Sequence, residues 1–180
     1  MHPVRLIAIV LLGLPGPAHA GKLATEGSHL AAASRQENTP PSGHQGVVKR
    51  GDHVMGFSHD KATHHFRLYT DGGAIEVEAN TADDKATRDE IRMHFGHIAK
   101  MFEAGDFSAP MLIHAQNPPG AATMKRLRDA IQYKVEDTKR GARIRILTKN
   151  AEALAAVHEF LRFQIKDHQT GDPNKVTRVP

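Results

Sequence analysis

The chain is 180 residues long, with a formal net charge of +4, 13 histidines and no cysteine. The lack of cysteine excludes disulfides, thiolate metal sites, a lipoprotein anchor and covalent haem attachment. The positive charge is mild and is not concentrated in one basic block, so nucleic acid is not expected as a partner.

The first 20 residues have the pattern of a secretory signal peptide. A basic start at Arg5 precedes the apolar run Leu6–Leu14, and the small residues Ala18-His19-Ala20 provide a cleavage site. The apolar run is far shorter than the roughly 20 residues of a membrane-spanning helix, and no later segment comes close. We therefore expect a periplasmic or secreted protein, cleaved near Ala20, whose formal charge falls from +4 to +3 because Arg5 is lost.

Residues 21–51 are rich in Gly, Ser, Pro and polar side chains and show no sustained apolar period. Such a segment buries too little apolar surface to order itself, so we expect a disordered leader. Residues 52–170 are the expected single α+β domain, and residues 171–180 the C-terminal tail.

Two alternating segments, His64–Tyr69 and Ala74–Ala79, predict a β-hairpin around the turn Asp71–Gly73. Successive side chains of a strand point to opposite faces. His64 should therefore lie on the core face of the hairpin, and His65 should face the other way.

A helix over about residues 82–104 is expected next, capped by Asn80 or Thr81 and ended by the glycine that follows. Its core stripe comprises Ile91, Phe95, Ile98 and Phe102. His94 and His97 lie on one flank of this stripe, three residues apart, so both rings can reach one point. Alternatively, His94 edges the core while His97 faces solvent.

The second half of the domain repeats this plan after a short apolar run, Pro110–His114, which is a possible fifth strand, and a short helix at about 121–130. Ile131–Glu136 and Ala142–Leu147 predict a second hairpin, and a helix follows over about 151–169. The expected fold class is α+β: a mainly antiparallel sheet of four or five strands with helices on one face, built from two hairpin–helix (ββα) halves.

Asn150 should cap the last helix, whose core stripe comprises Leu154, Val157, Leu161 and Ile165. His158 and His168 fall within this stripe. They are ten residues apart, roughly 15 Å along the axis, so at most one of them can join a given site. Phe160 and Phe163 point away from the stripe and predict a second packing surface, for the leader, the tail, another subunit or a neighbouring helix of the same domain.

The densest group of histidines lies at residues 53–66, where a predicted loop turns into the first strand. If the loop folds back, His59 approaches His64, and Asp60 can fix the tautomer of a ligand imidazole. We predict a transition-metal site here, with candidate ligands His53, Met55, His59, His64, His94 and His114. Nitrogen with thioether donors suits copper, whereas nitrogens alone suit zinc, nickel or copper. Alternatively, these histidines cap strands, fill loops and face water.

The common catalytic signatures are missing: the chain has no G-x-S-x-G elbow, Walker loop, G-x-G-x-x-G or H-E-x-x-H. Acid–base chemistry by His59 or His64 with Asp60 is open, because imidazole titrates near neutral pH. No substrate follows from the sequence, so a non-catalytic role is favoured.

Three segments carry a resemblance to a known group: Met55–Phe66 (MGFSHDKATHHF), Asp71–Ala79 (DGGAIEVEA) and Phe160–Asp172 (FLRFQIKDHQTGD). They are similar to small exported bacterial proteins that often carry an automatic aspartate carbamoyltransferase label. The resemblance spans nearly all of residues 52–172 and implies a shared fold and export, but no catalytic residues. The label itself does not fit, since carbamoyltransferases are longer two-domain proteins with Ser-x-Arg-Thr and His-Pro-x-Gln motifs. The one His-Pro here is His2-Pro3, and no Ser-x-Arg-Thr occurs.

The leading functional hypothesis is an exported binding module that holds copper or zinc through its histidines. The first alternative is a domain for a small ligand or a protein partner, a second copy included, which uses the Phe160 and Phe163 face or the exposed side of the sheet. The second alternative is a small periplasmic enzyme with a histidine base.

Overall fold

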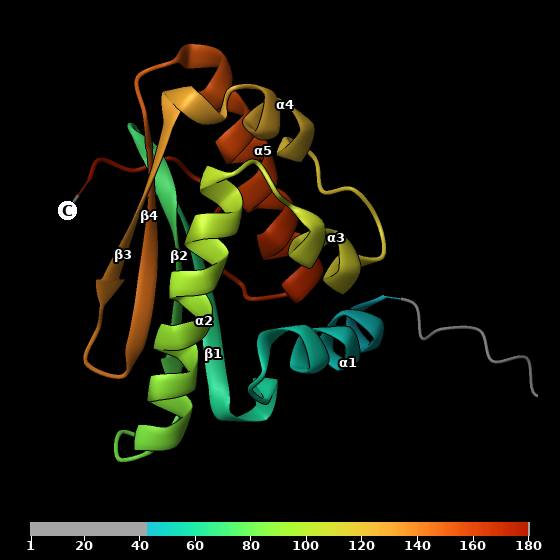
Figure 1. The fold of residues 1–180 in the computed structure, drawn as a ribbon, viewed down its shortest axis with the longest axis vertical. Helices are drawn as coiled ribbons and strands as arrows, with labels where there is room; N and C mark the ends of the chain where they lie inside the picture. The colour runs from blue at the N-terminus through green and yellow to red at the C-terminus, as the bar shows by residue number, and fades with distance from the viewer. Residues whose placement is uncertain (1–42, 180) are drawn as a thin grey trace, which may run out of the picture. The chain divides into compact units, whose positions relative to one another are not determined.

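The computed structural model of the chain describes residues 43–179. The predicted signal peptide and most of the predicted leader lie outside the described residues. Within this part of the chain the fold is α+β, as predicted, with helices packed on a four-stranded antiparallel sheet in the order β1-β2-β4-β3 (Figure 1). No helix between residues 43 and 179 is long and apolar enough to cross a membrane.

The strands are β1 (Ala62–Tyr69), β2 (Gly72–Ala79), β3 (Ile131–Asp137) and β4 (Gly141–Thr148). The helices are α1 (His44–Met55), α2 (Lys85–Glu103), α3 (Ser108–His114), α4 (Ala121–Arg126) and α5 (Ala151–His168), with 3-10 turns at His59–Lys61 and Arg128–Ala130. A long helix follows each hairpin. Because α1, α3 and α4 do not fit such a repeat, two equivalent ββα halves are not confirmed.

The sheet has an apolar face and a charged face, since side chains alternate along each strand. Helix α2 packs against β3 and β4, and α5 against β1 and β2, on the apolar face (Figure 1). The side chains on this face include His64, Phe66, Leu68, Val77, Ile144 and Ile146. On the charged face, Arg143 lies between Glu76 and Glu136, with its Nε 2.8 Å from Glu76. The predicted opposite orientation of His64 and His65 is confirmed.

Helix α5 approaches β2 closely at Gly73. A Cβ atom at this position would lie 2.2 Å from Leu161 Cδ1 and 2.5 Å from the Arg67 carbonyl oxygen, so a larger residue would clash with both the helix and β1. Nearby, His158 Nε2 donates to the carbonyl oxygens of Tyr69 and Gly72, at 2.9 and 3.0 Å. The turn between β1 and β2 is thereby tied to the middle of α5.

Helix α1 corrects two predictions, that the leader is disordered as far as residue 51 and that a loop contains His53. Its buried positions Val47, Gly51 and Met55 recur every four residues, and the helix contacts α3 and α5. Glycine lowers intrinsic helix propensity, and α1 contains two, one of them Gly46. Packing against other helices therefore stabilises α1, and such packing is not visible in the local sequence.

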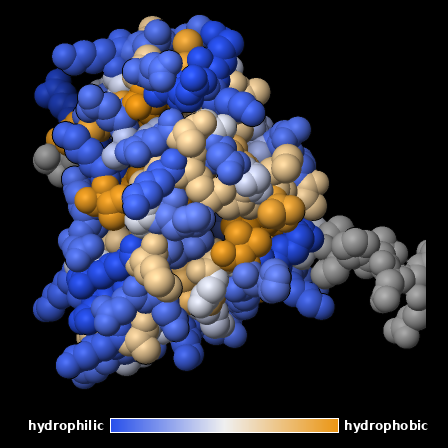
Figure 2. Space-filling view, in the orientation of Figure 1, coloured by the Kyte–Doolittle hydropathy of each residue, from blue (hydrophilic) through white to orange (hydrophobic). Residues whose placement is uncertain are grey.

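Helix α3 replaces the possible fifth strand at Pro110–His114. Asp106 begins the turn into the helix by accepting from Ser108 N at 2.8 Å, and proline is tolerated in the first turn. Side chains of α3 also reach solvent: Met111 is 40% exposed and Leu112 58%. Figure 2 shows hydrophobic side chains gathered over α3 and its border with α1, on a face that is otherwise mostly hydrophilic.

The helix caps are predicted correctly for α5 and incorrectly for α2. Asn150 Oδ1 accepts from Ala153 N at 3.0 Å, as expected. Helix α2 is capped by Asp84 instead of Asn80 or Thr81. Asn80 instead donates from Nδ2 to the Asp60 carbonyl oxygen at 2.9 Å, which joins the end of the hairpin to the loop before β1.

The segment after α5 runs back along β1. Thr177 forms a parallel bridge with Tyr69 at the edge of the sheet. Asp172 accepts from Phe66 N at 2.9 Å and lies 3.1 Å from His65 Nδ1. Burial by itself raises the pKa of Asp172, but these bonds and those from Thr170 and Arg67 outweigh burial and lower it. His65 is therefore engaged on the charged face of the sheet.

Candidate functional site

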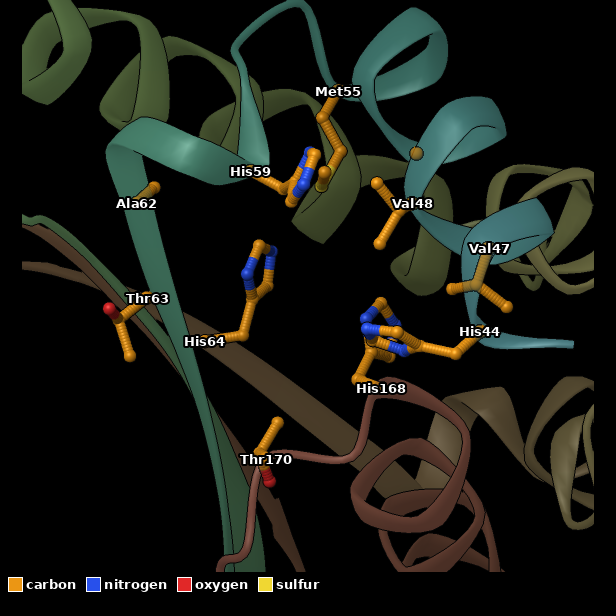
Figure 3. Close-up of a pocket in the computed structure, with 11 residues that line it drawn as sticks. His44, Val47, Val48, Met55, His59, Ala62, Thr63, His64, His168 and Thr170 are labelled. Carbon is orange, nitrogen blue, oxygen red and sulfur yellow. The ribbon is translucent and has the colours of Figure 1, made fainter.

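A pocket of about 210 Å³ lies between α1, the start of β1 and the C-terminal end of α5. Its lining includes His44, Val47, Met55, His59, His64 and His168. In Figure 3 the rings of His59, His64 and His168 and the side chain of Met55 point toward the same space. The pocket thus brings the C-terminal end of α5 to two elements from the start of the described chain.

His64 reaches the pocket because strand alternation places it on the helix-covered face of β1. Its ring is nearly parallel to that of Phe57, with centroids 6.2 Å apart, and to that of His168, at 5.5 Å. Burial lowers the pKa of His64 to about 4, helped by neighbouring histidines, of which His94 contributes most. The His64 ring is therefore unprotonated at neutral pH.

His168 is the last residue of α5 and extends the inward-facing side of that helix. Its ring lies 5.0 Å from that of His114 at nearly a right angle. Burial lowers the pKa of His168 to about 2, with further contributions from His64, His114 and His44. His168 is also unprotonated, and it was missing from the predicted ligand set.

A third unprotonated ring belongs to His94, on the flank of α2. It meets Phe57 edge-on at 5.7 Å, and burial lowers its pKa to about 4, with repulsion from His97. His97 is exposed, so the alternative interpretation of this helix is correct. Within residues 43–179, no hydrogen bond involves a ring nitrogen of His64, His94 or His168. These three imidazoles therefore have free nitrogens.

His59 is held differently, because both of its ring nitrogens face carboxylates. Nδ1 lies 3.0 Å from Asp52 Oδ1, and Nε2 lies 3.1 Å from Asp60 Oδ1. The predicted pairing of Asp60 with a histidine of the cluster is therefore present. Asp52 was missed because its helix was predicted to be a leader and loop. His59 lines the pocket, but other protein groups already occupy its nitrogens.

His114 is also satisfied at both nitrogens. Its Nδ1 makes a short contact with the Asp167 carboxylate, and its Nε2 lies 2.8 Å from Gln164 Oε1. Other protein groups therefore already engage both ring nitrogens. The remaining candidate, His53, is exposed on α1 and does not line this pocket.

The two histidines of α5 occupy different sites, as their spacing along the helix predicts. His158 is bonded to the β1–β2 turn, whereas His168 faces the pocket. Of the alternatives for the Phe160 and Phe163 surface, packing against a neighbouring helix of the same domain is the correct one for Phe160. Phe160 is only 1% exposed, and its ring lies 6.0 Å from that of Phe102 in α2. It belongs to the core of its own domain, since α5 is buried on two sides.

Carboxylates and imidazoles alone do not form a metal site among the described residues. Within residues 43–179, no group of three or more His, Cys, Asp or Glu side chains could hold a metal ion. Methionine is not one of those four residue types. The buried Met55 lines the pocket together with His64 and His168. Two imidazoles without hydrogen bonds and one thioether therefore line the same pocket.

No protein-family model matches the chain, and the comparisons with curated proteins and with solved structures also give no match. The arguments about function therefore rest on the geometry and chemistry of the pocket. Export and the resemblance to small exported proteins stay predictions.

Proposed function

We propose that this protein is a copper-binding module that holds copper(I) in the pocket between α1, β1 and α5. The ligands are the imidazoles of His64 and His168 and the thioether of Met55. The observation that supports the proposal most strongly is that two unprotonated rings, with centroids 5.5 Å apart, line one pocket with Met55 and have no hydrogen bond within residues 43–179.

Unprotonated imidazole is the form that binds a metal, since a proton on the donor nitrogen competes with the ion. The pKa of His64 is about 4 and that of His168 about 2, because both rings are buried. No proton has to leave either ring when a metal binds near neutral pH. The same low pKa values make these rings weak proton acceptors, so we do not propose a histidine-base enzyme.

Copper is favoured over zinc by the third donor. Thioether sulfur is a soft ligand that selects copper(I), whereas zinc sites use thiolate, imidazole and carboxylate in tetrahedral sets. Met55 is only 8% exposed, and Val47 and Val48 line the same pocket. These apolar side chains form part of the wall of the pocket.

The test is a competition titration of the purified chain with copper(I) and a chromophoric copper(I) chelator. We expect one copper per chain. Combining His64→Ala with His168→Ala should weaken binding by about 100-fold or more, because two of three donors are lost. Met55→Leu keeps the side-chain size and should weaken binding by roughly 10-fold.

The matched control combines His53→Ala with His97→Ala, which removes two exposed imidazoles from outside the pocket. This variant should retain full affinity. The proposal fails if the unaltered chain takes up no stoichiometric copper(I), or if the His64 and His168 double variant binds as tightly as the control.

A further inference from the structure

The two edges of the sheet differ in what covers them. At the β1 edge the C-terminal segment supplies backbone partners: Thr70 N donates to the Thr177 carbonyl oxygen at 3.0 Å, and Thr177 N donates to that of Leu68 at 3.0 Å. At the other edge, β3 pairs with β4 alone, and no segment within residues 43–179 pairs with its outer side (Figure 1). An uncovered edge offers unpaired N–H and C=O groups to another strand.

The hairpin of β3 and β4 fixes which backbone groups of β3 point outward. Thr138 N donates to the Gly141 carbonyl oxygen at 3.0 Å, next to the last opposed residues of the two strands. Hydrogen-bonded and non-hydrogen-bonded pairs alternate along an antiparallel ladder. Tyr133, Val135 and Asp137 therefore belong to non-hydrogen-bonded pairs and direct their N–H and C=O groups away from β4. Each of them offers a donor and an acceptor to a further strand.

The side chains of this edge have complementary charges. Lys134 and Glu136 are both exposed and lie on the charged face of the sheet. Lys134 has no ion pair within residues 43–179, and the residue opposite it on β4, Arg145, has the same charge. On the helix-covered face, Val135 is 41% exposed although it lies opposite the buried Ile144. The edge thus has a cation without a partner, an exposed carboxylate and an exposed apolar side chain between them.

We propose that the β3 edge binds a second copy of this chain, with the two β3 strands antiparallel and Val135 on the twofold axis. In this register Lys134 lies opposite Glu136 of the second copy, and symmetry repeats the ion pair. The outward-pointing backbone groups of the two strands face one another and form hydrogen bonds. A shift of two residues in either direction would instead place Lys134 or Glu136 opposite its own counterpart, which is unfavourable.

The occupant is a second copy because the edge complements itself. The two Val135 side chains meet at the axis and remove apolar surface from water. The pairing joins two four-stranded sheets into one continuous sheet. The copper pocket lies beside β1, at the opposite edge of the sheet, so this inference does not rest on the copper proposal.

Sedimentation equilibrium of the full-length chain is the first measurement. We expect a reversible dimer with a dissociation constant of roughly 1–100 μM, because the interface is limited to one strand and its flanks. A chain that stays monomeric at about 1 mM overturns the proposal.

Charge reversal tests the register. Lys134→Glu and Glu136→Lys each place like charges opposite one another, and each should weaken self-association by about 10-fold or more. An equimolar mixture of the two variants should form a heterodimer, because opposite charges then face each other at both positions. The matched control is Lys175→Glu, an exposed position in the C-terminal segment, which should dimerise like the unaltered chain. A mixture that associates no more tightly than either variant alone contradicts the register.

A cysteine scan needs no charge change, so it is informative even if a charge variant misfolds. The chain has no cysteine of its own. Val135→Cys places two thiols at the axis with Cα atoms about 5.5 Å apart, a separation that a disulfide can span. Gln132→Cys places them roughly 20 Å apart. Mild oxidation should cross-link the first variant and leave the second monomeric on a denaturing gel, and equal cross-linking of the two would overturn the proposal.

Discussion

Two groups of histidines in this domain differ in what their ring nitrogens contact. In the closed group, His59, His65, His114 and His158, ring nitrogens lie against carboxylates, an amide oxygen or backbone carbonyls. In the open group, His64, His94 and His168, no ring nitrogen has a hydrogen bond within residues 43–179. Burial lowers the pKa of each open histidine to about 4 or below.

The comparison separates two uses of the same side chain. A closed imidazole joins parts of the backbone and contributes to stability, because its donors and acceptors are paired inside the protein. An open imidazole has no hydrogen-bond partner within the described residues, so it adds little to folding and leaves a nitrogen free to bind a ligand. The number of histidines in a segment is therefore a weaker indication of a site than the contacts of their nitrogens.

The largest expected difference between the closed and open groups is in how much each histidine contributes to the free energy of unfolding. His158→Ala removes a buried ring and leaves the carbonyl oxygens of Tyr69 and Gly72 without their donor, so it should lower the free energy of unfolding by about 2–4 kcal/mol. His168→Ala removes an open ring at the end of its helix and should cost about 1 kcal/mol. Urea unfolding of both variants measures the difference. Equal losses would contradict the division into closed and open groups.

A smaller effect concerns pH. The pKa of His64 in the fold, about 4, lies below the unperturbed value of 6.5, so the unfolded chain takes up the proton first as pH falls. The free energy of unfolding should therefore decrease below about pH 6.5, by about 1–2 kcal/mol for each such histidine at about pH 5.

The pH effect is measured by urea unfolding at about pH 7 and pH 5. His168→Gln removes one of these titrating groups, whose pKa in the fold is about 2, and should show a loss smaller by about 1–2 kcal/mol. His53→Gln, on the exposed side of α1, is the matched control and should behave like the unaltered chain. A His168→Gln variant as acid-sensitive as this control would show that His168 does not have a strongly lowered pKa.

Features that depend on spacing within one element are the ones that the sequence predicts well. The period of a strand places His64 on the core face and His65 opposite, and the rise of a helix separates His158 from His168. Asn150 is recognisable as a cap because its side chain bonds within its own helix.

Features that depend on contacts between distant segments were missed. Helix α1 is stabilised by packing on α3 and α5, so residues 44–51 resemble a leader when viewed alone. Gln164 follows Val157 by seven residues and so borders the aliphatic stripe of α5, but its burial depends on the elements packed around that helix. His168 falls within the stripe of α5, but the arrival of β1 and α1 beside it is what makes it a site residue.

X-ray absorption spectroscopy of the copper(I)-loaded chain tests the central claim most directly, because it identifies the atoms bound to the metal. The copper proposal predicts two imidazole nitrogens and one sulfur around copper, with the sulfur lost in Met55→Leu and the imidazole signal lost when His64 and His168 are both replaced by alanine. A copper environment without sulfur, or one unchanged in these variants, would contradict the assignment of the pocket as the metal site.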